Sequence, residues 1–316
     1  MVERPAKKRL LGRIFRWTLL LGIVIIVTAV VVSRDSGMVP SRLLERYVAG
    51  EIAPASGEKI AIVEVDGLIM GESVEHVIKQ IHQARDDKHV KAIVLRVDSP
   101  GGTVSGSDRI WREVEILKLK GKPVVASMGG LAASGGYYVS APADTIFAEP
   151  TTMTGSIGVI AEFPQLAGLM EKVGVNFETI TTGEWKDSGS MFRPMTEVER
   201  KRWHTVIDDS YERFVRVVAQ GRKLPLDDVT SLANGKVYTA HEALKLKLIN
   251  QIGYLEDAIA DAKTRAGVSS ARVIKYAKPL NLSDLLIGMT AERPGFQLNQ
   301  ETLLRIQTPQ LLMLAR

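Results

Sequence analysis

Apolar and polar positions between residues 58 and 278 follow two periods, and the alternation between these periods predicts an α/β domain. Short apolar runs bounded by turn residues predict strands, and stretches with apolar residues three and four positions apart predict helices. Strands and helices follow one another about every 25 to 35 residues, as they do in parallel βα layers. The predicted strands are 60–65, 92–97, 123–128, 145–148, 156–160 and 177–180, and the predicted helices are 73–85, 105–119, 137–141, 164–173 and 196–221.

Residues 34–57 and 279–316 fall outside this alternation. The first segment contains two prolines and is interpreted as a connector with one short helix at 42–48. The second contains apolar stretches, including 311–314, that are too short and too interrupted to span a membrane. We expect this tail either to pack against a neighbouring subunit or to fold back onto the functional site as a self-inhibitory segment.

Residues 17–33 contain no charged side chain and predict a single membrane-spanning helix. The stretch is short for a span. A cleavable signal peptide, however, would have a shorter apolar core and a small-residue cleavage site, which does not follow here. Residues 1–16 carry six basic side chains and one acidic side chain, so the positive-inside rule leaves them in the cytoplasm. The lipid bilayer is thus an expected partner, and the rest of the chain is expected on its far side.

The net charge of +5 comes entirely from the first 16 residues, because the remaining basic and acidic side chains balance. No basic excess is left to neutralise phosphates, so nucleic acid is not an expected partner. The chain has no cysteine, which excludes disulfides, thiol nucleophiles and thiolate metal sites.

Residues 129–136, with the sequence Gly-Gly-Leu-Ala-Ala-Ser-Gly-Gly, connect the predicted strand 123–128 to the predicted helix 137–141. A serine on a tight turn between a buried strand and a helix projects from the rim of the sheet, where nucleophiles are commonly placed. A plain glycine-rich turn would have the same local sequence. The role of Ser134 therefore depends on what the other loops supply.

Three further loops are rich in small residues. Residues 98–102, Asp-Ser-Pro-Gly-Gly, follow a predicted strand, and their glycine N–H groups can face a ligand because no Cβ blocks them. Such a loop can form an oxyanion hole. Residues 154–158, Thr-Gly-Ser-Ile-Gly, enter a predicted strand, and residues 182–189 carry Lys186 among glycines and serines.

A serine nucleophile needs a base, and the five histidines are poorly placed for that role. All of them lie in or beside predicted helices, where surface or capping roles are expected; they are His76, His82, His89, His204 and His241. A neutral lysine can accept the serine proton if burial and hydrogen bonding lower its pKa by several units from about 10.4. Lys186 is the lysine whose neighbours best fit a pocket.

The four loops, in this order and spacing, resemble the signal peptide peptidase A family of bacterial membrane-anchored serine proteases. The resemblance covers roughly residues 58–265 and includes the N-terminal anchor. It implies that Ser134 is the nucleophile, that Lys186 is the general base and that Ser156 orients the lysine. It also implies an oxyanion hole formed by the N–H groups of Gly135 and of either Gly101 or Gly102.

The resemblance further implies the spiral of ββα units of Clp protease and crotonase, here in a short single-repeat form preceded by one transmembrane helix. In double-length relatives the serine and lysine come from different halves, so a dyad between Ser134 and the Lys186 of a neighbouring subunit is implied here, within a ring-shaped octamer. An apolar substrate pocket is expected from Val104, Leu131, Tyr137 and Met153. The implied parts are a cytoplasmic segment 1–16, a transmembrane helix 17–33, a connector 34–57, a protease domain 58–278 and a tail 279–316.

The implied activity is endopeptidase cleavage of remnant signal peptides and other unfolded segments. It would take place on the periplasmic or extracellular side of the bacterial cytoplasmic membrane, without a metal or cofactor. Two alternatives stay open. A crotonase-like acyl-CoA enzyme would share the fold and the oxyanion loops but needs no serine and lysine pair, and an inactive membrane scaffold would need neither.

Overall fold

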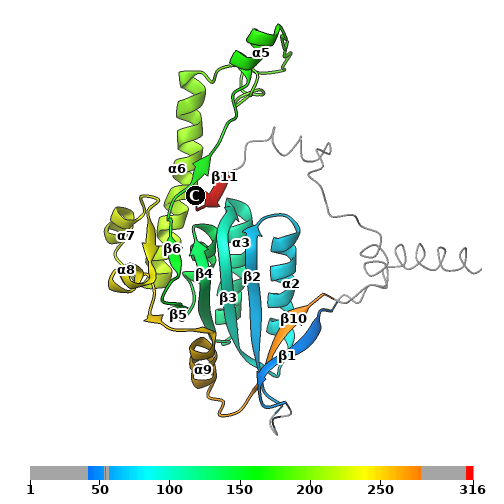
Figure 1. Cartoon of the computed structure of the whole chain (residues 1–316), viewed down its shortest axis with the longest axis vertical. Coiled ribbons are helices and arrows are strands. Elements are labelled where there is room, and N and C mark those ends of the chain that lie inside the picture. Colours follow the sequence, from blue (N-terminus) through cyan, green and yellow to red (C-terminus); the bar gives the residue numbers. More distant parts are fainter. Residues whose placement is uncertain (1–41, 53, 55–56, 279–310, 316) are drawn as a thin grey trace, which may run out of the picture. The chain divides into compact units, whose positions relative to one another are not determined.

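The computed structural model describes residues 42–52, 54, 57–278 and 311–315, which form a mixed sheet flanked by helices (Figure 1). The main path of the sheet has the order β1-β10-β2-β3-β4-β5-β9. Its strands and helices are β1 (Leu44–Gly50), β2 (Lys59–Ile69), α2 (Glu72–Asp86), β3 (Val90–Thr103), α3 (Val104–Leu119), β4 (Val124–Ala133), α4 (Gly135–Ser140), β5 (Thr145–Ala148), β6 (Met153–Gly155), β7 (Ile160–Ala161), α5 (Ala167–Val173), α6 (Glu197–Arg222), α7 (Leu226–Leu232), β8 (Val237–Thr239), α8 (Ala240–Lys245), β9 (Gln251–Ile252), α9 (Leu255–Ala266), β10 (Arg272–Ala277) and β11 (Leu311–Leu314).

Strands β10, β2, β3, β4 and β5 run parallel, and helices cover both faces of this central part. Parallel strands that are buried on both faces have nearly continuous apolar sequences, as in Val124–Ala126. Alternate side chains, such as Ile62 and Val94, pack against α9 in one cluster. The intervening side chains face the layer of α2, α3 and α4.

Most of the predicted elements are present, and the α/β class is confirmed. The long helix begins after Thr196, whose hydroxyl accepts a hydrogen bond from the Glu199 N–H, while the Glu199 carboxylate accepts one from the Thr196 N–H. This reciprocal pair is the predicted capping box. The extra elements β6 and β8 pair with each other, and β6 also extends the sheet beside β4.

Three predictions of local structure were wrong. Residues 42–48, predicted as a helix, contribute most of β1, which pairs with β10, so residues 44–50 of the expected connector belong to the sheet. The predicted strand 156–160 is interrupted because Ser156 has a φ of 49°, which a strand cannot accommodate. Residues 177–180 form no strand; their alternating pattern is not packed against the sheet.

The arm, defined here as residues 162–196, extends away from the sheet between β7 and α6 (Figure 1). Its helix α5 has no buried residue. No helix in the part of the chain that the structure describes is long and apolar enough to cross a membrane. The predicted transmembrane residues 17–33 lie outside that part.

The central strands β2, β3 and β4 carry many fully buried apolar residues, and Leu95 tests their contribution to stability. Leu95 lies between Val63 of β2 and Ala126 of β4 and is 1% exposed. We expect Leu95→Ala to lower the free energy of unfolding by about 2–5 kcal/mol, because it removes buried methyl groups and leaves a cavity. Urea denaturation would measure the change. Leu119→Ala is the matched control, since Leu119 is 85% exposed, and an equal loss in both variants would contradict the assignment of the core.

Candidate active site

Two serines lie side by side where strands β4 and β6 end. The parallel register pairs Ala133 with Gly155, so Ser134 and Ser156 are the next residues on adjacent strands. Neighbouring strands lie about 4.8 Å apart. Ser134 has a φ of 52° and Ser156 a φ of 49°, a region that serine seldom adopts. Such conformations cost about 1–3 kcal/mol each and are concentrated at functional sites.

The backbone of Ser134 is firmly held, whereas its hydroxyl is free. The Ser134 N–H donates to the Gly155 carbonyl at 2.7 Å, and the Ser134 carbonyl accepts from the Tyr138 N–H at 2.8 Å. Its Oγ is buried and has no hydrogen-bond partner among the described residues. A buried hydroxyl without a partner is destabilising, so its presence on a strained turn indicates a reactive position.

Glycines from two loops converge beside Ser134. A Cβ placed on Gly101, whose φ is 103°, would lie 2.7 Å from the Gly135 nitrogen, and one placed on Gly135 would lie 3.1 Å from the Gly102 nitrogen. Side chains at these positions would fill the space, so glycine is required here by close approach. The Gly101 N–H donates to Ser99 Oγ at 3.0 Å. Of the two candidate donors in this loop, the Gly101 N–H is therefore already engaged.

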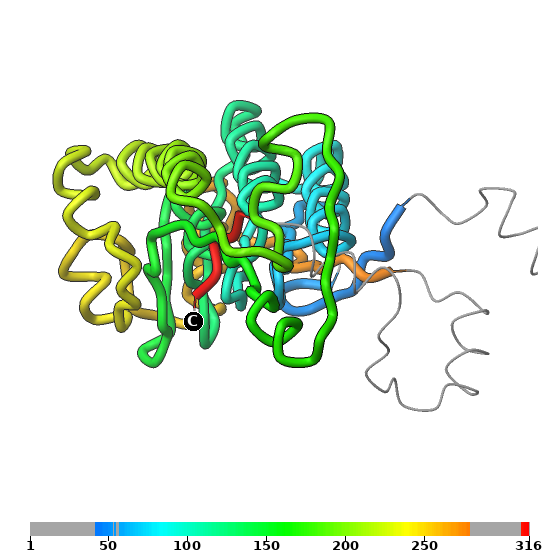
Figure 2. Tube along the Cα trace, turned by 90° about the horizontal axis from the view of Figure 1, so that it is seen from above, coloured from blue at the N-terminus to red at the C-terminus, as the bar shows by residue number. Residues whose placement is uncertain are grey.

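The end of the tail lies at this loop. Strand β11 pairs antiparallel with residues 101–103 of β3 on one side and with β7 on the other. Viewed from above, it lies among the connections at the upper end of the sheet (Figure 2). Met313 is fully buried. The described part of the tail thus folds onto the candidate site of its own chain.

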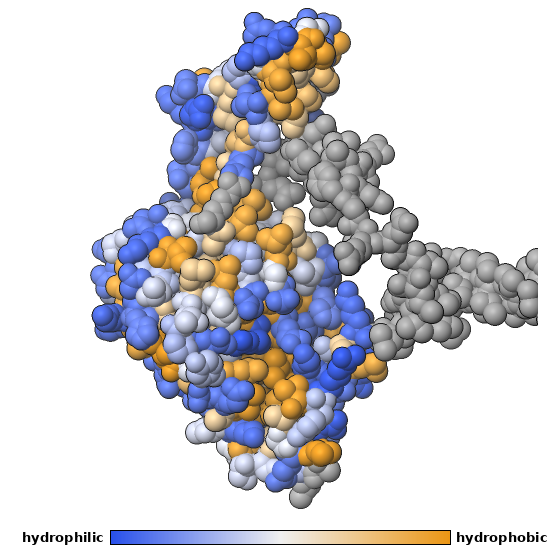
Figure 3. All heavy atoms as spheres, viewed as in Figure 1, coloured by the Kyte–Doolittle hydropathy of each residue, from blue (hydrophilic) through white to orange (hydrophobic). Residues whose placement is uncertain are grey.

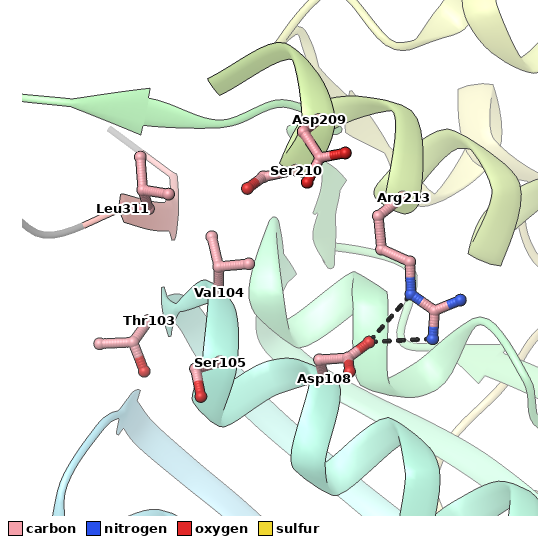
Figure 4. A pocket seen from close by; sticks show the side chains of 8 residues that line it. All are labelled: Thr103, Val104, Ser105, Asp108, Asp209, Ser210, Arg213 and Leu311. Carbon is pink, nitrogen blue, oxygen red and sulfur yellow. Dashed lines mark hydrogen bonds and ion pairs between the residues drawn. The ribbon is translucent and has the colours of Figure 1, made fainter. Parts of the chain in front are cut away.

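Two cavities flank this strand. One of about 580 Å³ lies between α3, α6 and β11, and Val104 and Leu311 are among the residues that line it (Figure 4). The other, of about 450 Å³, is lined by Ser156, Tyr211 and Leu314, among others. Val104, which was predicted to line a substrate pocket, lines the first cavity.

The other predicted pocket residues lie elsewhere. Tyr137 is completely buried, and its hydroxyl donates to the Leu248 carbonyl at 2.8 Å. Burial raises its pKa. It therefore packs in the core and does not line a substrate pocket, because the first turn of α4 points its side chain inward. Leu131 and Met153 are paired across β4 and β6, and Met153 is 51% exposed.

An ionic cluster that the sequence pattern did not reveal fixes α4. The Tyr138 hydroxyl donates to Asp108 Oδ1 at 2.5 Å, and Arg213 donates to the same oxygen at 3.1 Å. The Arg213 guanidinium also lies 4.2 Å from the centre of the Trp111 ring. Burial and the hydrogen bond to Asp108 raise the pKa of Tyr138. These residues come from three helices, α3, α4 and α6, so no regular spacing in the sequence links them.

Lys186 lies in a turn of the arm and is exposed. No hydrogen bond within the chain joins it to Ser134, whose hydroxyl is unpartnered in the described structure. The turn itself is anchored: Arg193 forms ion pairs with Asp187 at 2.7 Å and with Glu199 at 2.6 Å. The hydrogen bond from Arg193 lowers the pKa of Glu199 to about 2. The arm thus presents Lys186 in a defined turn, outside the site of its own chain.

Among the described residues, no group of three or more His, Cys, Asp or Glu side chains could hold a metal ion. The chemistry available at the site comes from hydroxyl groups and backbone N–H groups.

The strand-to-helix turn thus carries an unpartnered serine next to a glycine cradle at one edge of the α/β sheet. The profile of Peptidase family S49 matches residues 116–269, and the Clp protease profile matches residues 58–154.

The similar proteins carry protease names. A candidate protease of Methanocaldococcus jannaschii is 38% identical over 264 residues, which cover 79% of this chain and 84% of the relative. A candidate signal peptide peptidase, SppA, of Enterococcus faecium is 38% identical over 233 residues, covering 70% of this chain and 68% of the relative. Protease 4 of Haemophilus influenzae is 39% identical over 212 residues, covering 65% of this chain but 34% of the relative. The chain belongs to peptidase family S49, the signal peptide peptidase A family, and it has the Clp protease-like α/β fold.

The anchoring of the Lys186 turn predicts a response to acid. The pKa of Glu199 is lowered from 4.5 to about 2 in the folded chain, so its ion pair with Arg193 stabilises the fold above pH 4.5. This contribution disappears as the pH falls from 4.5 toward 2. Trp203 donates to Ser188 Oγ at 3.1 Å and is the natural fluorescence reporter. We expect a change in its emission within this interval.

Glu199→Gln is the control for this titration, because it keeps the side-chain shape without the carboxylate. Its emission should change less than that of the wild type between pH 4.5 and 2, because only the ion pair of Arg193 with Asp187 is left to titrate. The same transition in Glu199→Gln would show that another group controls the turn.

Proposed function

We propose that the protein is a serine endopeptidase in which Ser134 is the nucleophile and Lys186 of a second copy is the general base. Ser156 orients the lysine amine, and the N–H groups of Gly135 and Gly102 form the oxyanion hole. The observation that carries this proposal is the β4–β6 register, which sets a free, buried Ser134 hydroxyl beside Ser156 and the glycine cradle. Gly102 is preferred over Gly101 because the Gly101 N–H already donates to Ser99.

The reaction follows from these positions. The neutral lysine amine accepts the Ser134 proton while Oγ attacks the peptide carbonyl carbon. The two glycine N–H groups stabilise the negative charge that develops on the carbonyl oxygen. The resulting ammonium then donates its proton to the departing amine, leaving an acyl-enzyme. Water that gives its proton to the same lysine hydrolyses the ester and restores Ser134.

Two observations support a lysine from a second copy. The cavity beside Ser156 has room for an incoming side chain, and none of the described residues that line it is charged. The arm also exposes an apolar surface that the other described residues leave uncovered (Figure 3). Its exposed apolar residues are Leu166, Leu169, Val173, Val175, Phe177, Ile180 and Trp185. A neighbouring copy covering this surface would also remove the lysine amine from water, which favours its neutral form. The subunit number that we propose is the octamer implied by the resemblance.

The proposed substrates are remnant signal peptides and other unfolded apolar segments. The name of the Enterococcus faecium relative, signal peptide peptidase, is consistent with them. We propose that residues 17–33 anchor the protein in the bacterial cytoplasmic membrane and that the catalytic domain lies on the extracytoplasmic side. The support for this is the uncharged stretch preceded by six basic side chains.

Mixing two inactive variants tests the shared dyad. We expect Ser134→Ala and Lys186→Ala each to lower peptide hydrolysis by at least about 10³-fold, because each removes one half of the proton-transfer pair. When the two are co-assembled in equal amounts, roughly a quarter of the sites should combine an intact serine with an intact lysine. Hydrolysis of a fluorogenic peptide measures the recovery.

The control is Lys172→Ala, which removes another lysine of the arm and should keep full activity. Failure of the mixture to recover activity, with assembly verified by native mass spectrometry, would mean that the dyad forms within one chain or that Lys186 is not the base.

A fluorophosphonate probe distinguishes the proposal from its two alternatives. We expect covalent labelling of the wild type and none of Ser134→Ala, because only an activated serine reacts at an appreciable rate. Mass spectrometry would locate the label. An inactive scaffold would not be labelled, and turnover of acyl-CoA without peptide hydrolysis would favour the crotonase-like enzyme.

A further inference from the structure

The glycine loop at the end of β3 lies where this strand pairs irregularly with β2. One residue lies between the paired positions Asp66 and Leu68 of β2. Two residues lie between their partners on β3, which are Asp98 and Gly101. An extra residue of this kind interrupts the ladder and leaves backbone groups without a strand partner. Because the loop is buried, these groups need hydrogen bonds from another source.

The side chain of Ser99 supplies these hydrogen bonds. Ser99 is fully buried, and its Oγ donates to the Gly67 carbonyl at 2.6 Å and accepts from the Gly101 N–H at 3.0 Å. Gly67 is the β2 residue that the register leaves unpaired. Pro100, the other residue of the irregular stretch, has no N–H that needs a partner. One hydroxyl thus joins the two strands at the point where their ladder is interrupted.

The main chain of Ser99 also lies against the helix that begins after Ser134. A Cβ placed on Gly136 would lie 2.8 Å from the Ser99 carbonyl oxygen, and one placed on Gly135 would lie 3.1 Å from the Gly102 nitrogen. These close approaches leave little room for the loop and the helix to move independently. The loop that Ser99 holds is therefore fixed relative to the proposed nucleophile.

We infer that Ser99 is a positioning residue for the oxyanion hole. By engaging the Gly101 N–H, its hydroxyl sets the orientation in which the loop presents the Gly102 N–H to the reacting carbonyl. This inference rests on the proposed function. Gly101 has a φ of 103°, and two consecutive glycines have many accessible conformations unless hydrogen bonds select one. Ser99 acts on the reaction only through this loop.

Ser99→Ala removes the hydroxyl and tests this role. We expect kcat for a fluorogenic peptide to fall about 10-fold to 100-fold, because oxyanion hydrogen bonds act mainly in the transition state. The KM should stay within about 2-fold of the wild type. The affinity of a peptide aldehyde, whose adduct with Ser134 places an oxygen in the oxyanion hole, should fall by a factor similar to that of kcat. Ser99→Cys keeps a weaker donor and acceptor and should lie between the wild type and Ser99→Ala.

Ser127→Ala is the matched control. Ser127 is 1% exposed and lies in β4 opposite Arg96, whose guanidinium donates to its Oγ at 3.0 Å. Urea denaturation should show a loss of stability in both alanine variants, whereas kcat and aldehyde affinity should fall only in Ser99→Ala. An unchanged or higher kcat in Ser99→Ala would overturn the inference. A fall in kcat without a loss of aldehyde affinity would show that Ser99 has only a structural role and would overturn it as well.

Hydrogen exchange measured by mass spectrometry distinguishes failure of this inference from failure of the proposed function. The segment 98–102 has few amide hydrogens, since Pro100 has none. We expect its exchange to be at least about 3-fold faster in Ser99→Ala than in the wild type or Ser127→Ala, because the Gly101 N–H loses its acceptor. Unchanged exchange would overturn the inference even if the enzyme cleaves peptides. Faster exchange in Ser99→Ala, together with a wild type that hydrolyses no peptide and binds no aldehyde, would overturn the proposed function and leave the contact between Ser99 and the loop in place.

Discussion

The alignment of two adjacent parallel strands is the constraint on which the site depends. Because Ala133 is paired with Gly155, the chain leaves both strands at the same level, and Ser134 and Ser156 emerge next to each other. Each serine then adopts a positive φ, and each is held by a backbone hydrogen bond, from Ser134 to Gly155 and from Ser156 to Lys236. A shift of one residue in this register would separate the hydroxyl groups and turn them toward opposite faces of the sheet.

The rest of the domain supports these two turns. Helix α4 is fixed behind Ser134 by the buried Tyr137 and by the contact between Tyr138 and Asp108, which Arg213 extends to α6. On the other side, the Thr154 hydroxyl donates to the Ala132 carbonyl at 2.6 Å and ties β6 to β4. The strain at the serines is therefore opposed by the packing and hydrogen bonds of the elements on either side of them.

The sequence pattern predicted those parts of the fold whose apolar residues face a packed neighbour. The strands and helices between 59 and 148, and the cap at Thr196, have such neighbours. Pattern reasoning failed where packing and local pattern disagree. Residues 177–180 alternate like a strand but lie in the arm, away from the sheet, and residues 44–50 join the sheet edge without a strong period. Leu311–Leu314 was noted as apolar, but its place depends on contacts more than 200 residues away along the chain.

Part of the candidate site could be predicted from the sequence for the same reason. Ser134, Ser156 and the glycines belong to loops in which the close approach of backbones requires small residues. A run of small residues can be recognised in the sequence. Lys186 is harder to recognise in the sequence, since it lies in an exposed turn of the arm. The anchoring of the arm by Arg193 and the cluster around Asp108 involve ordinary charged residues on separate helices. Only three-dimensional structure brings them together.

Strand β11 has a consequence for the two strands that it joins. It pairs with residues 101–103 of β3 and with β7, so it covers two strand edges at once. An uncovered edge presents unpaired N–H and C=O groups and is a template for association with another chain. The last described residues of the chain therefore protect the domain from association through these edges.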